Sequence, residues 1–272
     1  MAQFGHRFSA GDFPATHTDE FRGAHFEVRD LTGARFTDCD LTGVRVIDGF
    51  LTDVHLSGWV DGLTVNGVDV TGFVESELDK RHPERVQLRS LRSAADYRAL
   101  WQRLETLWAD LVVRVRRLPE SAAYRQVDGE WSFVQTLRHL VFVTDAWASR
   151  TVLDIEQPYH SLGLPQTWYP VADALELGLD PAAAPSFDAV LDARADRVAV
   201  LGRIFDELTD EGLGRPCARV PAPGYPEEVR PVGECLWVVL EEECEHLRYA
   251  ARDVAVLETA PGDDGEAAGG SR

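Results

Sequence analysis

Large apolar residues recur at every fifth position near the start of the chain. The series consists of Phe21, Phe26, Leu31, Phe36, Leu41, Val46, Leu51 and Leu56. Neither a helix, with its period of about 3.6 residues, nor a flat strand, with its period of about 2, produces this spacing. A four-sided solenoid does, because each five-residue side turns its central residue inward. The pattern therefore predicts a short right-handed quadrilateral β-solenoid of two coils within a first domain, residues 1–75.

The rest of the chain follows a helical pattern. Residues 76–90 show no regular period and are expected to form a linker. Apolar residues then return at three- and four-residue steps, which predicts helices over 94–118, 132–153, 186–208 and 232–258. Ser132, with Gln135 three residues later, is typical of a capped helix start. The fold class is therefore mixed, with an up-down four-helix bundle over residues 91–258 after the solenoid and a disordered tail over 259–272.

The charged residues of the last predicted helix fall into two groups, one opposite the apolar arc and one beside it. On a helical wheel, Glu245 and Arg248 fall opposite the apolar arc and form an ordinary solvated face. Glu242 and His246 lie one turn apart and flank the arc, and Glu243 points closer to the core. A buried carboxylate is costly without a partner, so these groups should be paired, hydrogen-bonded or metal-bound. For this helix alone, a Glu–Arg ion pair and a core histidine are the favoured interpretation.

The second predicted helix carries a further histidine. Its sequence is apolar except for residues near its start and an outward stripe of Arg138, Asp145 and Ser149, and His139 lies on the flank of the core arc. A lone histidine there is usually a packed core residue. In an up-down bundle, however, the second and fourth helices can present side chains to one cavity. Two histidines and one carboxylate would leave one coordination position open, as in catalytic zinc sites, and the set also suits Fe(II), with Mn or Ni as alternatives.

The stretches "GEWSFVQTLRHL" and "EECEH" resemble the DinB/YfiT-like metalloenzyme superfamily. The resemblance implies a four-helix bundle with metal ligands at His139, Glu242 and His246. Many members have His where Glu242 stands, and the Glu form is similar to the mycothiol-dependent maleylpyruvate isomerase branch. The stretches "RDLTGA" and "CDLTGV" resemble the pentapeptide-repeat family.

Other residues near these ligands are expected to support them. Glu243, Tyr249 and Asp253 share the flank or its edge, and Glu243 is the alternative carboxylate ligand. The loop over residues 158–170 is a candidate lid, which would bring Tyr159, His160 and Trp168 near the substrate, although simple packing of these rings explains them as well.

The resemblance implies a metal-dependent enzyme. A divalent cation, zinc first, would activate either a water molecule or a thiolate, for hydrolysis, S-transfer or isomerisation, and a low-molecular-weight thiol such as mycothiol would be the second cofactor. Two alternatives stay open: a metal-binding protein without catalysis, and a protein-interaction module built on the pentapeptide repeats.

Net charge limits the kinds of partner the protein can bind, and the cysteine pattern indicates the redox state of its thiols. The formal net charge of −19 would repel a nucleic-acid backbone or an anionic membrane, which leaves a small-molecule substrate. The sequence has no apolar run of transmembrane length and no signal peptide, so we expect a cytoplasmic protein. Four cysteines without a CxxC pair are typical of reduced thiols. A homodimer through the solenoid is compatible with these features.

Overall fold

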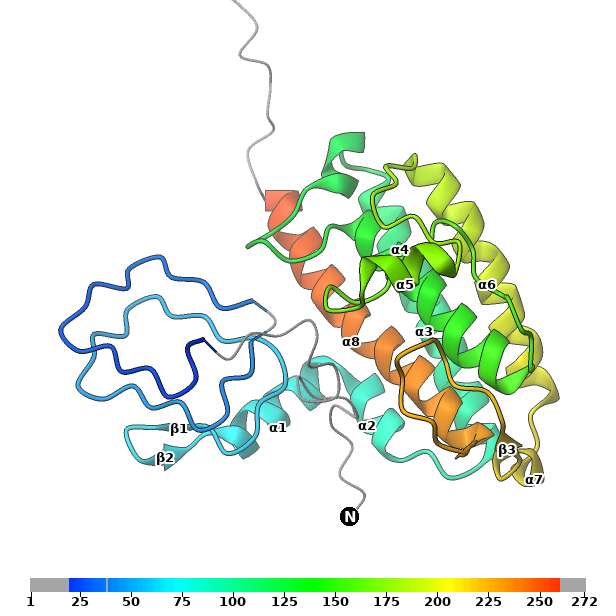
Figure 1. The fold of residues 1–272 in the computed structure, drawn as a ribbon, viewed down its shortest axis with the longest axis horizontal. Coiled ribbons are helices and arrows are strands. Elements are labelled where there is room, and N and C mark those ends of the chain that lie inside the picture. Colours follow the sequence, from blue (N-terminus) through cyan, green and yellow to red (C-terminus); the bar gives the residue numbers. More distant parts are fainter. Residues whose placement is uncertain (1–19, 38, 260–272) are drawn as a thin grey trace, which may run out of the picture.

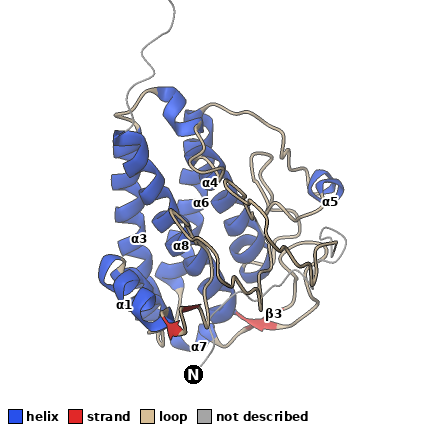
Figure 2. Cartoon of the chain, turned by 90° about the vertical axis from the view of Figure 1, so that its left-hand side faces the viewer, coloured by secondary structure: helices blue, strands red, loops and turns tan. Residues whose placement is uncertain are grey.

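The computed structural model describes residues 20–37 and 39–259, which form a helical part and a coiled part beside it (Figure 1). Four long helices make up the helical part: α3 (Ala94–Val115), α4 (Phe133–Val143), α6 (Phe187–Glu207) and α8 (Val232–Thr259). Figure 2 shows these helices together, with the loop that carries α5 to one side. The predicted helices are thus present, and the predicted tail beyond Thr259 lies outside the described residues.

Local sequence sets where these helices begin. Ser132 accepts a hydrogen bond from the backbone of Gln135, whose side chain binds the Ser132 backbone in return, so the expected capping box is formed. Ser93 and Asp96 form a second box at the start of α3, and Ser186 caps α6. After Val143, α4 continues without a break as the π-helix η4 (Thr144–Val152), a widening that the apolar pattern does not reveal.

The core lies between the four helices. Leu104, Leu140, Leu201 and Leu236 are completely buried, and the Trp101 and Phe205 rings stack with centroids 5.5 Å apart. Shorter elements lie in the connections between the long helices: η3 (Glu120–Tyr124), α5 (Val171–Glu176), α7 (Asp210–Leu213), and the antiparallel pair β3 (Pro216–Cys217) and β4 (Arg230–Pro231). Within the described part of the chain, no helix has the length and apolarity of a membrane-spanning segment.

The stretch expected to be a linker, residues 76–90, contains the end of α1 (Thr71–Arg81) and all of α2 (Pro83–Arg89). These helices follow the short hairpin of β1 (Thr64–Val65) and β2 (Val68–Asp69). Pro83 suits the first turn of α2, where its missing N–H is not needed. Ion pairs of Arg85 join α2 to its neighbours: Arg85 binds Glu75 on α1 and Glu245 on α8. The apolar pattern gave no sign of these helices because charges, not an apolar stripe, fix them.

The repeat segment, residues 20–58, keeps its period of five in the backbone. Left-handed φ angles recur at Gly23, Val28, Gly33, Gly43, Asp48, Asp53 and Gly58. Type II turns follow from this, for example Leu31 to Ala34, where the Ala34 N–H donates to the Leu31 carbonyl at 3.0 Å. In Figure 1 the segment winds round in coils beside the helices.

The predicted β-solenoid is not seen. No strand forms among the described residues from 20 to 63, and the apolar residues expected inside the coils are between 43% and 65% exposed. Eight five-residue sides make only two coils, so each coil has one neighbour and one open face. The backbone hydrogen bonds of the segment close turns within a coil. The repeat therefore shapes the chain path without building a buried core.

Candidate metal centre

His139 lies in the middle of α4 and is 1% exposed. Its Nδ1 is 2.9 Å from the carbonyl oxygen of Leu164. A carbonyl oxygen can only accept, so Nδ1 carries the hydrogen and the Nε2 atom of a neutral ring presents its lone pair. That Nε2 faces α8, where Glu242 lies.

Glu242 and His246 lie one turn apart on α8. The Glu242 Oε2 atom is 3.3 Å from His139 Nε2 and 3.1 Å from His246 Nε2. One donor atom from each of the three side chains can be chosen so that all lie within 4.8 Å of one another. The structure therefore brings together the three residues that the sequence singled out as ligands.

The charges of this group are closely linked. Burial lowers the pKa of His139 below its ordinary value, against the pull of Glu242. Burial also opposes the ionised form of Glu242, but the close His139 and His246 side chains outweigh it and hold the pKa of this carboxyl well below its usual range. Glu242 is thus a carboxylate that requires positive charge beside it.

Glu243, the alternative ligand, has a different neighbour. Its side chain is completely buried and forms an ion pair with Arg194 on α6. Burial raises the pKa of Glu243, and Arg194 opposes that rise. A residue engaged in the bundle interior in this way does not face the two histidines, so geometry favours Glu242 as the third member.

Comparison with known families now decides the family. The sequence model of the DinB superfamily matches residues 103–250, more than half of the chain, and includes all three residues of the centre. The chain belongs to the DinB superfamily. Pentapeptide repeats match residues 20–58 in eight copies, as the period of five predicted. Searches of curated proteins and of solved structures gave no match.

Trp131 covers the centre of this DinB protein. Its ring lies 4.8 Å from the His139 ring and stacks on His246, with centroids 5.8 Å apart and an angle of 13° between the planes. The two imidazole rings are 4.8 Å apart. The sequence contains Trp131 only as part of the family stretch "GEWSFVQTLRHL", and its position directly before the Ser132 cap was the available signal.

The loop between η4 and α6, residues 153–186, folds back over the outer face of α4 and η4. The polar stripe that was expected to face solvent there is therefore covered, and that expectation was wrong. Arg138, Asp145 and Ser149 are all buried. The Arg138 guanidinium donates to three carbonyls of the loop, those of Leu162, Asp180 and Ala183. Arg138 is polar because it binds backbone carbonyls of this loop, not because it faces water. These carbonyls lie far away in the sequence, so the pattern along the helix could not reveal them.

The same face holds a second anchor. Asp145 accepts hydrogen bonds from Arg197 on α6 and from the backbone N–H of His160. The backbone N–H of Leu164 donates to the Arg138 carbonyl at 3.1 Å, which holds the Leu164 carbonyl against His139. The DinB centre thus depends on a loop contact as well as on two helices.

The three lid candidates pack within this loop and against a second one, residues 214–231. The Tyr159 hydroxyl donates to the Pro221 carbonyl, and its ring stacks on Phe142 with centroids 6.2 Å apart. The Trp168 ring is 6.2 Å from Tyr225. His160 Nδ1 accepts from the backbone N–H of Leu162. The loop reaches the centre through Leu164, whereas a lid function for these rings stays a prediction.

Tyr249 and Asp253 belong to an arginine cluster further along α8. The guanidinium groups of Arg248 and Arg252 lie 4.1 and 5.4 Å from the centre of the Tyr249 ring. Asp253 accepts from Arg252 at 2.7 Å. These contacts support α8 beyond His246.

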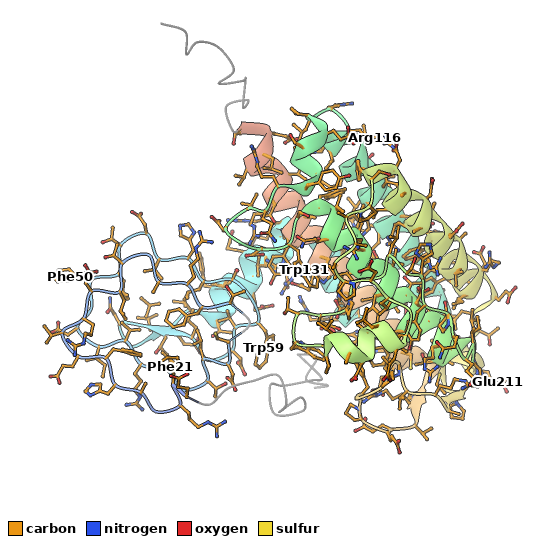
Figure 3. The ribbon with its side chains drawn as sticks, turned by 45° about the horizontal axis from the view of Figure 1, so that its top comes forward. Phe21, Phe50, Trp59, Arg116, Trp131 and Glu211 are labelled. Carbon is orange, nitrogen blue, oxygen red and sulfur yellow. The ribbon has the colours of Figure 1, made fainter. Side chains whose placement is uncertain are left out.

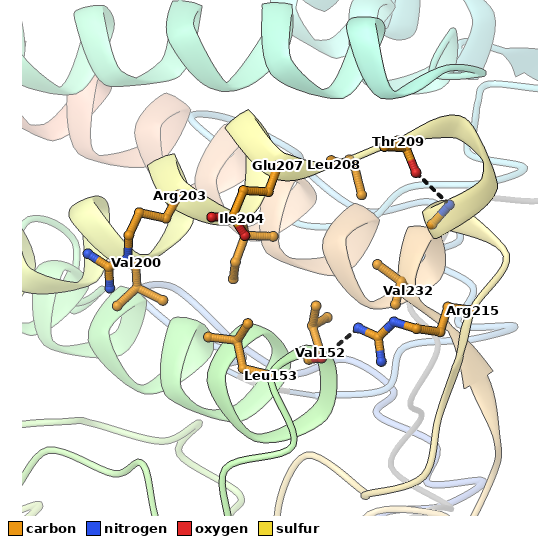
Figure 4. Close-up of a pocket in the computed structure, with 11 residues that line it drawn as sticks. Val152, Leu153, Val200, Arg203, Ile204, Glu207, Leu208, Thr209, Arg215 and Val232 are labelled. Atoms are coloured by element: carbon orange, nitrogen blue, oxygen red, sulfur yellow. Dashed lines mark hydrogen bonds between the residues drawn. The ribbon is translucent and has the colours of Figure 1, made fainter.

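Two other features lie apart from the centre. The four cysteines are free thiols, and buried Cys217 and Cys235 are hydrogen-bonded to each other, which lowers the pKa of Cys217. A hollow of about 270 Å³ lies between η4, the end of α6 and the start of α8 (Figure 4). Arg215 closes one side by donating to the Val152 carbonyl at 2.7 Å. His139, Glu242 and His246 are not among the residues that line it.

Proposed function

We propose that this DinB protein binds a divalent metal through His139, Glu242 and His246, with zinc as the first expectation and Fe, Mn or Ni as alternatives. The observation that carries the proposal is the convergence of the two Nε2 atoms on one carboxylate oxygen, at 3.3 and 3.1 Å. Donor atoms about 2.0–2.1 Å from a tetrahedral zinc lie about 3.3 Å from one another. The distances of 3.3 and 3.1 Å suit that geometry.

The protonation of the group supports the same proposal. With Nδ1 bound to the Leu164 carbonyl, a neutral His139 faces the Glu242 carboxylate with a lone pair. Two acceptors at this distance repel each other unless positive charge lies between them. Burial opposes the alternative, an imidazolium at His139. A divalent cation supplies the charge and uses both lone pairs.

We further propose an enzyme that acts on a small electrophile. A metal bound by three protein ligands keeps a position open and can lower the pKa of a water or thiol there. The Leu164 carbonyl fixes the orientation of the His139 ring, and Trp131 shields the two imidazoles. The ion pair of Arg194 with Glu243, the residue after Glu242, holds α8 in place. Glu242 in place of the His of many members favours a thiol co-substrate such as mycothiol, and metal-activated water is the alternative nucleophile.

The test begins with the metal. Chain stripped of metal is titrated with zinc against a chromophoric chelator, and wild type is expected to bind one zinc per chain. His139→Ala and His246→Ala should each lose this binding, whereas His160→Ala, a histidine outside the centre, should keep it. Equal zinc binding by all four proteins would contradict the proposal. Zinc-loaded wild type is then assayed against a panel of electrophiles with and without mycothiol, which separates transfer from hydrolysis.

The exposed apolar residues of the repeat segment favour a second candidate function, an interaction surface. Val28, Ile47 and Phe50 are 95%, 79% and 102% exposed, and apolar surface that stays exposed to solvent often marks protein contacts. The partner we propose is a second copy of the chain. Light scattering should give the mass of a dimer for wild type and of a monomer for Ile47→Ser/Phe50→Ser. A monomer for wild type at high concentration would exclude this candidate.

A further inference from the structure

We propose that the pentapeptide-repeat segment positions Trp131 over the metal centre, with Arg35 and Ser57 as the positioning residues. The consequence for metal and substrate access rests on the proposed function, but the contacts themselves do not. The repeat segment would thereby contribute to the same site that the helical part builds.

Arg35 and Ser57 bind one short loop, residues 127–131, directly before α4. The Arg35 Nη1 donates to the Asp128 carbonyl at 2.8 Å, and the Ser57 hydroxyl donates to Glu130 Oε1 at 3.2 Å. Arg35 and Ser57 are about one four-sided coil apart in sequence. Successive coils therefore contact neighbouring residues of the same loop, which is a two-point attachment.

The loop is shaped for this contact. Asp128 and Gly129 both adopt left-handed φ angles, +52° and +79°. A Cβ atom at residue 129 would lie only 2.8 Å from Arg35 Nη1. Glycine at this position thus serves both the backbone angle and the close approach of the arginine.

The loop carries the contact to the centre. Glu130 uses its second oxygen to accept from Arg252 on α8 at 2.8 Å, so the loop is also tied to the helix of Glu242 and His246. The next residue is Trp131, whose ring stacks on His246 and touches His139. Figure 3 shows Trp131 on the side of the helical part that faces the repeat segment.

The stacked ring lies where the centre is least buried. The side chains of Glu242 and His246 are 27% and 20% exposed, whereas that of His139 is buried. Trp131 therefore shields the accessible side of the group. Releasing the loop from Arg35 and Ser57 should let the ring move off His246 and expose the centre.

The experiment labels the full chain with 5-fluorotryptophan and follows its seven tryptophans by fluorine NMR. Trp131→Phe identifies the Trp131 resonance. Arg35→Ala/Ser57→Ala is expected to shift or broaden that resonance and to leave in place the five other tryptophans of the helical part, whereas Trp59, two residues from Ser57, is not used as a control. Arg45→Ala, which removes another exposed arginine of the repeat segment, should leave it unchanged. Arg35→Lys should restore part of the wild-type position, because an ammonium can donate to the same carbonyl.

A second measurement follows zinc release to a chelator. The double variant is expected to release zinc about tenfold faster, the low end of the effect of supporting contacts around a metal. A Trp131 resonance that stays unchanged in the double variant overturns the proposal, and a shifted resonance with unchanged release overturns the shielding. If wild type binds no zinc, the proposed function fails while the fluorine spectrum still decides this inference.

Discussion

Glu242 and Glu243 are neighbours in the chain but meet different surroundings. Successive helical residues point about 100° apart, so one carboxylate faces His139 and His246 while the other enters the bundle interior. Glu243 is completely buried and depends on Arg194 for its counter-charge. The two residues therefore allow a matched comparison of a ligand with a structural ion pair.

We expect Glu242→Gln to weaken zinc binding on the order of 100-fold, since a neutral amide cannot replace the carboxylate ligand. Glu243→Gln should keep zinc binding and lower the free energy of unfolding by about 3–5 kcal/mol, because it leaves Arg194 buried without a partner. Zinc titration and urea denaturation of both variants check this. Loss of zinc by the Glu243 variant alone would reverse the assignment of the ligand.

At the scale of elements, sequence predicted what depends on local signals. The long helices begin where Ser132 and Ser186 cap them, because caps and apolar periodicity act within a few residues. In the repeat segment, the period of five predicted the positions of the turns. It did not predict the exposure of the apolar residues, because two coils are too few to enclose a buried interior. Arg138 and Asp145 could not be placed from sequence, since the loop that buries them lies up to 45 residues further along.

The candidate site was predictable for a related reason. Spacing along α8 placed Glu242 one turn from His246, and the family resemblance supplied the partner on α4. The Leu164 carbonyl was not predictable, because a backbone acceptor leaves no pattern in the sequence, and the place of Trp131 before the Ser132 cap did not reveal that its ring stacks on His246.

The helices α1 and α2 offer a test of their ionic attachment. A hydrogen bond from Arg89 holds the pKa of Asp79 below its ordinary value of 3.8. Because the folded-state pKa is the lower one, the contribution of Asp79 to stability is complete above about pH 4 and is lost as the pH falls through the folded-state value.

Asp79→Asn should therefore destabilise α1 and α2 by up to about 1 kcal/mol at neutral pH, as expected for a partly exposed pair. The difference from wild type should shrink below pH 3.8. Hydrogen exchange of the backbone amides of residues 71–89, measured from pH 7 to pH 3, checks this. A difference that grows on acidification would contradict the sign.

At the scale of the whole molecule, four remote segments meet at one point. His139 comes from α4, Leu164 from the folded-back loop and Glu242 with His246 from α8, while the loop of Trp131 connects this group to the repeat segment. A divalent cation at the centre would join α4 to α8 directly, and the two loops would support it through the Leu164 carbonyl and the Trp131 ring.

The most direct test of the central claim is X-ray absorption at the zinc edge of the zinc-loaded chain, prepared without thiols. We expect two imidazole nitrogens at about 2.0–2.1 Å, one carboxylate oxygen at about 2.0–2.2 Å and one further light atom. A sulfur neighbour at about 2.3 Å, from a site at Cys217 and Cys235, or fewer than two imidazoles would contradict the account.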